Sequence, residues 1–227
     1  MTSLTAEDFI ERSPLYPLHA GARLAALGNS AVVARYSEQE ERAQLERCAL
    51  IDLTNLPRVG FRGADSAAYL SARDFQLPDA ANQSLTQADS SLIARLSQTE
   101  YLLLGSLHDV GARIAALEAD WRLGDSANYL LPRQDSHAWL QLTGQYIAEV
   151  MAKLCGVDLR PKAFPMGAVA QTSAARINVI VINQSAGDLP SFQILCDRAS
   201  VNYFWDAMLD AMQEFGGAPV GVDALLD

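Results

Sequence analysis

The segment HAWLQLTGQYIAEVMAKLCGVDLRPKAFPMGAVAQTSAA, residues 137–175, carries the clearest structural pattern in this sequence. A short apolar run, 137–142, leads to a turn at Gly144. The apolar residues that follow recur at the spacing of one helix face: Ile147, Val150, Met151, Leu154 and Cys155. Gly156 stands where a helix of this length ends. The segment therefore predicts a strand, a glycine turn and a helix that packs on a core.

The same unit occurs earlier, in residues 50–78 with the sequence LIDLTNLPRVGFRGADSAAYLSARDFQLP. There an apolar run leads to Gly63. A small residue follows each glycine by four positions, Ala67 after Gly63 and Ala148 after Gly144, and we expect it to let each helix lie close to a sheet. Two copies about 80 residues apart indicate a pseudo-repeated α+β core, because a solenoid needs at least ~3 repeats to bury a continuous core.

The spacing of apolar residues predicts further elements on either side of these units. The expected elements are a strand at 31–36, a hairpin at 91–104, a helix at 109–121, strands within 167–183 and at 191–196, and a helix at 201–215. Residues 1–20 are predicted to form an extended N-terminal arm that lies on its own domain or docks on a partner. The α+β domain is predicted to cover 21–217, and a flexible tail is predicted for 218–227.

The composition is that of an acidic globular protein. The chain is 50% hydrophobic, which is too apolar for a disordered protein. Its formal net charge of −10 argues against nucleic acid and membrane surfaces as partners, because both require clustered Lys and Arg. Cys48, Cys155 and Cys196 lie in apolar segments without CxxC spacing, which predicts reduced, buried thiols. We see no secretory signal and no apolar run of ~18 residues, so a cytoplasmic location is expected.

Motifs that carry chemistry are few. His19, His108 and His137 lack the Cys, Asp or Glu spacing of a metal site, and each ring is expected at the surface or hydrogen-bonded locally. No GxGxxG opens a helix, so a dinucleotide site is not predicted. The triplet at 124–126 is interpreted as a turn and not as a hydrolase serine. Asp52 follows an apolar run, and a strand-end or outward-facing position is favoured over a catalytic role.

Several segments together resemble the glycine-cleavage T-protein and its folate-binding relatives. These segments are 13–16 with His19, 21–24, 48–54, 61–67, 140–144 and 192–194. The stretches 160–167 and 198–205, with the chain length, most resemble the gamma subunits of heterotetrameric sarcosine oxidases. The resemblance covers roughly residues 13–216. It implies an α+β folate-binding scaffold of two pseudo-repeated sheet-plus-helix units, without the C-terminal barrel of the full-length enzymes.

Departures from the family pattern bear on the function that the resemblance implies. Active T-proteins carry a catalytic Asp in an Asp-Asp hairpin, and the matching hairpin 91–104 has no such pair. They also carry a Gly-Tyr-x-Gly-Glu stretch whose Glu binds the pterin, where this chain has 183–190 with only Asp188. Loss of that carboxylate removes a charge-assisted hydrogen bond worth ~1.5–3 kcal/mol. The Lys-Gly-Cys-Tyr motif of the iron–sulfur-repair branch is also absent.

The resemblance therefore implies a non-catalytic gamma-type subunit of a multi-subunit sarcosine oxidase, with no catalytic, cofactor-binding or metal-binding residues of its own. Such an enzyme demethylates sarcosine to glycine with FAD, FMN and NAD on its larger subunits and passes the one-carbon unit to tetrahydrofolate. The expected partners are the other subunits of a hetero-oligomeric amine oxidase. Two alternatives remain open: a free-standing tetrahydrofolate-binding aminomethyltransferase-like protein, and the equivalent subunit of another N-methyl amine dehydrogenase.

The N-terminal arm supplies the expected partner interface. Its residues Leu15, Tyr16 and His19 lie in an otherwise polar segment that contains Pro14 and Pro17. Apolar side chains in such a segment require a covering surface. We therefore predict that these three residues contact a partner.

Overall fold

The computed structural model describes residues 4–38, 41–185 and 187–226. The chain groups into two units. Unit 1 comprises residues 1–55, 137–166 and 172–227, and unit 2 comprises residues 56–136 and 167–171. The predicted α+β class is confirmed, because each unit combines a sheet with helices. The range 21–217, predicted as one domain, thus contains two units that each form around a sheet of their own.

Unit 1 is built around a six-stranded sheet. Its strands are β3 (Ala49–Asp52), β9 (His137–Thr143), β10 (Val169–Ala174), β11 (Ile177–Asn183), β12 (Ser191–Asp197) and β13 (Ala218–Pro219). The first half of β10, residues 169–171, is grouped with unit 2. They lie in the order β10-β11-β12-β9-β3-β13. Strand β9 pairs antiparallel with both β12 and β3, and β13 pairs parallel with β3. A separate antiparallel pair joins β1 (Arg23–Leu27) to β2 (Ser30–Arg35).

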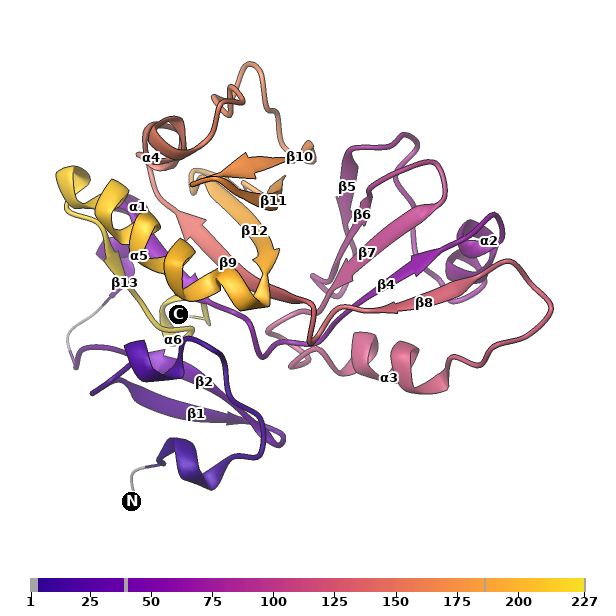
Figure 1. Cartoon of the computed structure of the whole chain (residues 1–227), viewed down its shortest axis with the longest axis horizontal. Coiled ribbons are helices and arrows are strands. Elements are labelled where there is room, and N and C mark those ends of the chain that lie inside the picture. The colour runs from indigo at the N-terminus through magenta and orange to yellow at the C-terminus, as the bar shows by residue number, and fades with distance from the viewer. Residues whose placement is uncertain (1–3, 39–40, 186, 227) are drawn as a thin grey trace. The chain divides into compact units, whose positions relative to one another are not determined.

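The helices of unit 1 bury the apolar faces expected from the sequence. They are α1 (Arg42–Arg47), α4 (Ile147–Leu154), α5 (Val201–Met212) and α6 (Asp223–Leu226), with the short turns η1 (Ala6–Asp8), η2 (Tyr16–Leu18), η3 (Arg198–Ser200) and η4 (Gln213–Phe215). Helices α4 and α5 pack against each other beside the sheet (Figure 1). Val150 and Met151 of α4 are buried, as are Phe204, Trp205 and Met208 of α5.

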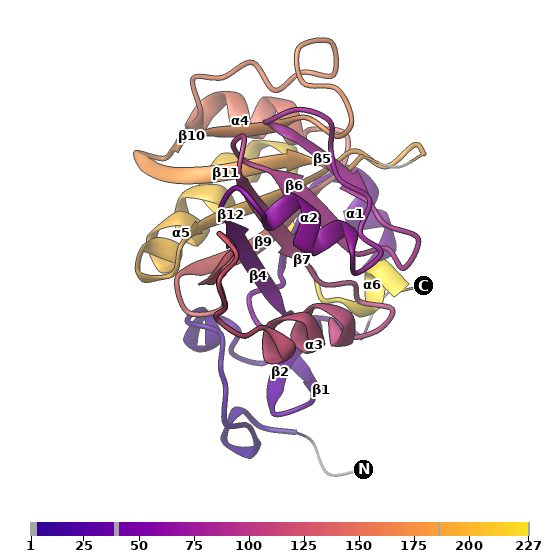
Figure 2. The same cartoon turned by 90° about the vertical axis from the view of Figure 1, so that its right-hand side faces the viewer.

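Unit 2 repeats this architecture with five strands. Its elements are β4 (Arg58–Arg62), α2 (Ser66–Ser71), β5 (Gln83–Thr86), β6 (Leu92–Arg95), β7 (Glu100–Leu104), α3 (Ala112–Asp120) and β8 (Tyr129–Pro132). The strands lie in the order β5-β6-β7-β4-β8, and all neighbours are antiparallel. Helices α2 and α3 lie in front of this sheet in Figure 2. Leu70 of α2 and Ile114 of α3 share one core cluster with Val59, Phe61 and Leu103 of the strands.

The topology confirms the predicted pseudo-repeat. Unit 2 runs β4, α2, β5, β6, β7, α3, β8, and unit 1 runs β9, α4, β10, β11, β12, α5, β13. In both sheets the first strand of the repeat lies beside the fourth, β4 beside β7 and β9 beside β12. The other neighbour of the first strand is also antiparallel in both sheets. In unit 2 it is β8, the last strand of the repeat, and in unit 1 it is β3, which comes before the repeat in the chain.

Each repeat turns from strand to helix at a glycine in the left-handed region. Gly63 has a φ of 142° and Gly144 a φ of 112°. A Cβ on Gly63 would lie 1.9 Å from the carbonyl oxygen of Ala127, and one on Gly144 would lie 2.4 Å from the carbonyl carbon of Arg47. Ala67, half-buried, packs against the core cluster of unit 2, and Ala148 is also half-buried. The closest approach to neighbouring backbone is made by the glycines themselves.

The end of the chain differs from its prediction as a flexible tail. Within 218–226, β13 and α6 are formed, and Val220 and Val222 are buried. The backbone N–H of Val220 donates to the carbonyl of Leu50 at 3.0 Å, and that of Val222 donates to Val33 at 2.9 Å. Because both the side chains and the backbone find partners, this segment belongs to the fold of unit 1. Residue 227 lies outside the described residues.

All three cysteines are free and buried, which confirms the prediction of buried thiols. Cys48 lies beside Gly217, where an added Cβ would come within 2.9 Å of its Sγ. Burial raises the pKa of the Cys48 thiol to about 11, although the nearby charges of Arg47 and Lys153 act to lower it. This thiol therefore stays protonated at neutral pH, and a protonated thiol is a poor nucleophile.

Candidate functional site

Asp52 ends β3 and is the centre of a buried polar cluster in unit 1. Its neighbours Leu50 and Ile51 belong to the core, and Asp52 itself is only 6% exposed. Ser13 Oγ donates to Asp52 Oδ2 at 2.5 Å, and the backbone N–H of Thr54 donates to Oδ1 at 2.9 Å. Nε2 of His19 lies 3.0 Å from the same Oδ2. Three partners offset the cost of burying an ionised carboxylate.

His19 joins the N-terminal arm to this carboxylate. It directly follows η2, and its backbone N–H donates to the carbonyl of Tyr16 at 3.1 Å. The second ring nitrogen, Nδ1, lies 2.7 Å from the hydroxyl of Tyr36. The imidazole also packs edge-on against Tyr36 and Trp205, with centroid distances of 5.8 and 5.3 Å. The ring is thus held at both nitrogens and by two aromatic neighbours.

Hydrogen bonds connect the four side chains in the order Ser13, Asp52, His19, Tyr36. An imidazole protonated on Nε2 donates to Asp52 and accepts at Nδ1 from Tyr36, so each group has a suitable partner. In a nucleophilic triad the base contacts the nucleophile, whereas here the Ser13 hydroxyl faces the carboxylate and both imidazole nitrogens are occupied. The cluster is therefore suited to ordering the arm and not to activating a nucleophile.

The pKa shifts in the cluster fix its charge state. Burial raises the pKa of the Tyr36 phenol, and the negative charges of Asp52 and Glu41 raise it further, so the phenol keeps its proton. Burial also acts to raise the pKa of Asp52. The interaction with His19 and the hydrogen bonds from Ser13 and Thr54 outweigh that effect and hold the pKa below its ordinary value. The Asp52 carboxylate is therefore ionised at neutral pH.

The stability of unit 1 is expected to fall in acid through Asp52. The folded-state pKa lies below the ordinary value, so the contribution of Asp52 is fully present above the unfolded-state pKa of ~3.9 and is lost as pH falls through the folded-state pKa. We expect the difference in unfolding free energy between native protein and Asp52→Asn to shrink below about pH 4. Urea denaturation across this range measures it, and a difference that stays constant into acid would contradict the role of Asp52.

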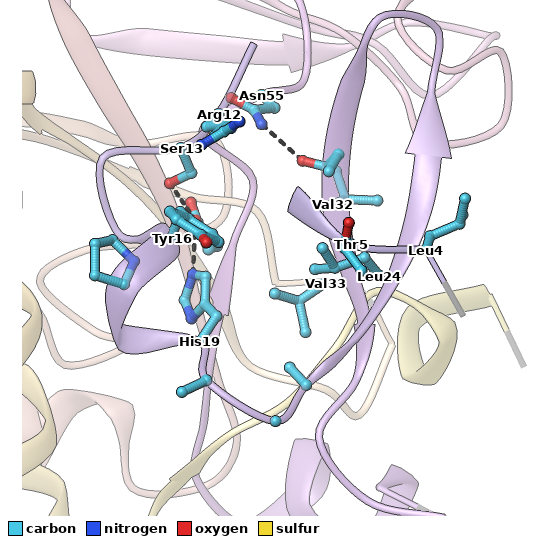
Figure 3. Close-up of a pocket in the computed structure, with 16 residues that line it drawn as sticks. Leu4, Thr5, Arg12, Ser13, Tyr16, His19, Leu24, Val32, Val33 and Asn55 are labelled. Atoms are coloured by element: carbon cyan, nitrogen blue, oxygen red, sulfur yellow. Dashed lines mark hydrogen bonds and ion pairs between the residues drawn. The ribbon is translucent and has the colours of Figure 1, made fainter. Parts of the chain in front are cut away.

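A cavity of about 360 Å³ adjoins this cluster. Figure 3 shows Ser13, Tyr16 and His19 on one side of it and Val32 and Val33 on the other. The walls come from the arm, from β1 and β2, and from the end of β3. The cavity therefore lies entirely within unit 1. Polar and apolar side chains therefore face each other across the cavity.

The predicted partner residues all lie at or near this cavity. Leu15 is fully buried within unit 1, His19 is buried in the polar cluster, and Tyr16 is 39% exposed at the cavity. The arm thus lies on its own unit, which was one of the two alternatives for it. Contact of these residues with a partner stays a prediction, and Tyr16 offers the accessible surface for it.

The buried cluster itself was missed by sequence reasoning. His19 was expected at the surface or with local partners, but it is buried and bonds to Asp52, 33 positions away. Asp52 does end a strand, as predicted, but its side chain points inward. One feature of the sequence could have pointed to the cluster: Ser13, His19 and Asp52 all fall in segments that resemble the T-protein family.

At the two places where the family resemblance implies acids, Arg95 and Asn183 donate hydrogen bonds to backbone carbonyls. In unit 2 the guanidinium of Arg95, at the start of the β6–β7 turn, donates to the carbonyls of Asp79 and Gln98 at 2.9 and 3.0 Å. In unit 1, Asn183 Nδ2 donates to the carbonyl of Phe164 at 2.6 Å. Its Oδ1 accepts from the backbone and hydroxyl of Ser185. These polar side chains stabilise the turn and the loop themselves.

Across residues 4–38, 41–185 and 187–226, no three His, Cys, Asp or Glu side chains are grouped to hold a metal ion. The same part of the chain contains no helix of the length and apolarity needed to cross a bilayer. The absence of a metal site and the cytoplasmic location stay predictions.

Comparison with known proteins relates the chain to aminomethyltransferases. The GCVT N-terminal domain family matches residues 11–226. An aminomethyltransferase from Symbiobacterium thermophilum is 25% identical over 240 residues, which cover 96% of this chain and 62% of that protein. The chain thus spans about 62% of the length of that enzyme and of an aminomethyltransferase from Anoxybacillus flavithermus.

A second group of similar proteins consists of sarcosine oxidase chains. The sarcosine oxidase subunit gamma of Corynebacterium sp. (strain P-1) is 27% identical over 168 residues, 72% of this chain and 79% of that subunit. A chain of the heterotetrameric sarcosine oxidase from Corynebacterium sp. U-96 superposes with a TM-score of 0.66 at 23% identity, covering 92% of this chain and 98% of that chain.

The aminomethyltransferase T of the glycine cleavage system from Bartonella henselae also has this fold. It superposes with a TM-score of 0.71 at 17% identity, covering 95% of this chain and 60% of that one. At such identities the two solved structures inform on fold alone. They confirm the predicted T-protein-like α+β architecture.

Proposed function

Because the chain belongs to the GCVT N-terminal domain family, we propose that it is a gamma-type subunit of a multi-subunit sarcosine oxidase, with a structural and non-catalytic role. The similarity to a sarcosine oxidase subunit gamma and the fold shared with a heterotetrameric sarcosine oxidase support a place in such a complex. The assembly would demethylate sarcosine to glycine and pass the one-carbon unit to tetrahydrofolate. FAD, FMN, NAD and tetrahydrofolate would bind to partner subunits.

The observation that carries the non-catalytic role is the chemistry of the loop 183–190. The T-protein resemblance implies a pterin-binding Glu there, but the loop has Asp188 as its only acid. Asn183 and Ser185 are occupied by hydrogen bonds within unit 1, and Gln184 Oε1 accepts from Gln193 Nε2 at 2.8 Å. The loop is thus stabilised by amides. It lacks the glutamate through which the resemblance implies pterin binding.

The similarity to aminomethyltransferases over 96% of the chain supports a second candidate, a tetrahydrofolate-binding aminomethyltransferase-like protein. Tetrahydrofolate titrated into the purified chain separates the two. We expect no micromolar binding by isothermal titration calorimetry, because the missing carboxylate removes a charge-assisted hydrogen bond worth ~1.5–3 kcal/mol. An active aminomethyltransferase serves as the positive control, and micromolar affinity for this chain would favour the second candidate.

Assembly with partners is tested by co-expressing the chain with the other subunits of a sarcosine oxidase. Omission of the chain should change the size of the purified complex and lower its activity, whereas a complete and fully active complex without it would contradict the proposal. Tyr16→Ala tests the proposed interface on the arm. Tyr203→Ala is its matched control, because Tyr203 of α5 is also an exposed tyrosine, 55% exposed against 39% for Tyr16.

A further inference from the structure

The cavity beside the buried polar cluster has the size and lining of a small-molecule site. Its volume of about 360 Å³ falls within the range of ligand pockets, roughly 300–1,000 Å³. Leu24 of β1 and Val32 and Val33 of β2 form an apolar side (Figure 3). Polar residues of the arm and of the β3 end form the opposite side. An apolar pocket with a few placed polar groups is the usual design of a ligand site.

The buried polar residues of the cavity present hydrogen-bond acceptors and a negative charge. Asp52 is buried and ionised, and its Oδ1 accepts one hydrogen bond, from the backbone of Thr54. Asn55, which is also buried, donates its Nδ2 to the carbonyl of Ala31 at 2.6 Å. Within the described residues no group donates a hydrogen bond to its Oδ1, which therefore has acceptor capacity left. A ligand group that reaches this part of the cavity should be a donor, and a cationic donor is favoured by the charge of Asp52.

The exposed part of the cavity presents the opposite charge. Arg12 and Tyr16 both line it and are exposed. The guanidinium carbon of Arg12 lies 5.4 Å from the centroid of the Tyr16 ring. Within the described residues, the Arg12 side chain forms no ion pair with a carboxylate. A guanidinium in this state has all its donors available for a carboxylate, which it binds in a bidentate manner.

We propose that this cavity binds a free amino acid, or a similar small zwitterion, with an apolar side chain. The ammonium group would bind at Asp52 and Asn55, the carboxylate at Arg12, and the side chain against Val32 and Val33. An anion without an ammonium group would leave the acceptors unused and meet the charge of Asp52. A cation without a carboxylate would leave Arg12 unpaired. The ligand is assigned to residues of this chain alone, so the inference goes beyond the proposed assembly function.

Binding is tested on the full chain with L-leucine and two analogues that each lack one charge. Isocaproate lacks the ammonium group, and L-leucinamide lacks the carboxylate. We expect L-leucine to bind by saturation-transfer NMR and calorimetry, and each analogue to bind at least about tenfold more weakly, the effect of losing one charge-assisted contact. Failure of L-leucine to bind at millimolar concentration, or binding of either analogue as tightly as L-leucine, would overturn the proposal.

Two variants locate the site. Arg12→Gln should weaken L-leucine binding at least about tenfold, whereas Arg23→Gln, at another exposed arginine of unit 1 that does not line the cavity, should leave it unchanged. Val33→Phe should block binding by filling the cavity. If that variant does not fold, Arg12→Gln decides alone, because its side chain is exposed. Unchanged binding in Arg12→Gln would overturn the proposal, and neither result depends on assembly with oxidase subunits.

Discussion

Replacing Gly63 with alanine is expected to destabilise unit 2 by about 2–6 kcal/mol, a large part of the stability of an ordinary domain. Two costs add up in this estimate. A φ of 142° is a conformation that residues with a Cβ rarely adopt, which costs about 1–3 kcal/mol. The new Cβ would also lie 1.9 Å from the carbonyl oxygen of Ala127, and relieving such a backbone clash costs about 1–3 kcal/mol more.

Gly144→Ala is expected to destabilise unit 1 by the same mechanism. Its φ is 112°, and its Cβ would lie 2.4 Å from both the carbonyl carbon and oxygen of Arg47. The obstacle is again backbone, which cannot move as a flexible side chain can. Because the two glycines occupy equivalent positions of the pseudo-repeat, we expect effects of similar size. Urea denaturation followed by circular dichroism measures both.

Each glycine has a matched control in its own unit. Gly124 in unit 2 and Gly156 in unit 1 are exposed, have no positive φ, and have no atom within 4 Å of an added Cβ. Alanine at these positions should change the unfolding free energy by no more than about 1 kcal/mol, and in the stabilising direction if it restricts the unfolded chain. Equal unfolding midpoints for Gly63→Ala and Gly124→Ala would show that the turn does not require glycine.

Replacing Asp52 with asparagine is expected to lower the stability of unit 1 by about 1–3 kcal/mol, the cost of leaving a buried hydrogen-bonding group without its partner. Asparagine keeps the shape of the side chain but replaces one acceptor oxygen of the carboxylate by a donor. Ser13 and His19 both approach Oδ2, while Oδ1 faces the backbone N–H of Thr54. With the amide oxygen toward Ser13 and His19, the NH2 group would meet the backbone N–H of Thr54, a donor against a donor. With the NH2 group toward them, Ser13 and His19 would have to accept instead of donate, which reverses the hydrogen bond between His19 Nδ1 and Tyr36.

Asp158→Asn is the matched control for Asp52→Asn. Asp158 forms an ion pair with Arg160 at 2.6 Å, but both side chains are largely exposed to solvent. That pair lowers the pKa of Asp158 to about 2, yet solvent screening keeps its effect on folding small. We expect an unchanged urea midpoint for Asp158→Asn. A midpoint for Asp52→Asn that matches this control would refute the role of the buried cluster.

The elements with regular apolar spacing could be predicted from the sequence. The helix face of α5 and the strand–glycine–helix units at Gly63 and Gly144 are local patterns, because periodicity and turn chemistry are set by neighbouring residues. Because both units of the pseudo-repeat are built from such local patterns, the repeat could be seen in the sequence. The fold class follows from these local signals together with the family resemblance.

The polar cluster and the end of the chain depend on contacts that no local pattern records. Asp52 is buried because Ser13 and His19 reach it from the arm, and the same carboxylate without them would be expected at a surface. The segment 218–226 is too short for periodicity, and its order comes from hydrogen bonds to Leu50 and Val33. Tertiary partners decide both cases, and they are found only once the chain is folded.

The interleaved course of the chain has a consequence for biosynthesis. Strand β3 is made early, yet its neighbours in the sheet are β9 and β13, and β13 is encoded near the end of the sequence. All strands of the five-stranded sheet lie between β3 and β9 in the sequence, so they emerge from the ribosome before β9 does. Unit 2 can therefore begin folding during translation, whereas β3 must wait with an unpaired edge. A nascent-chain chaperone would have most to protect during this interval.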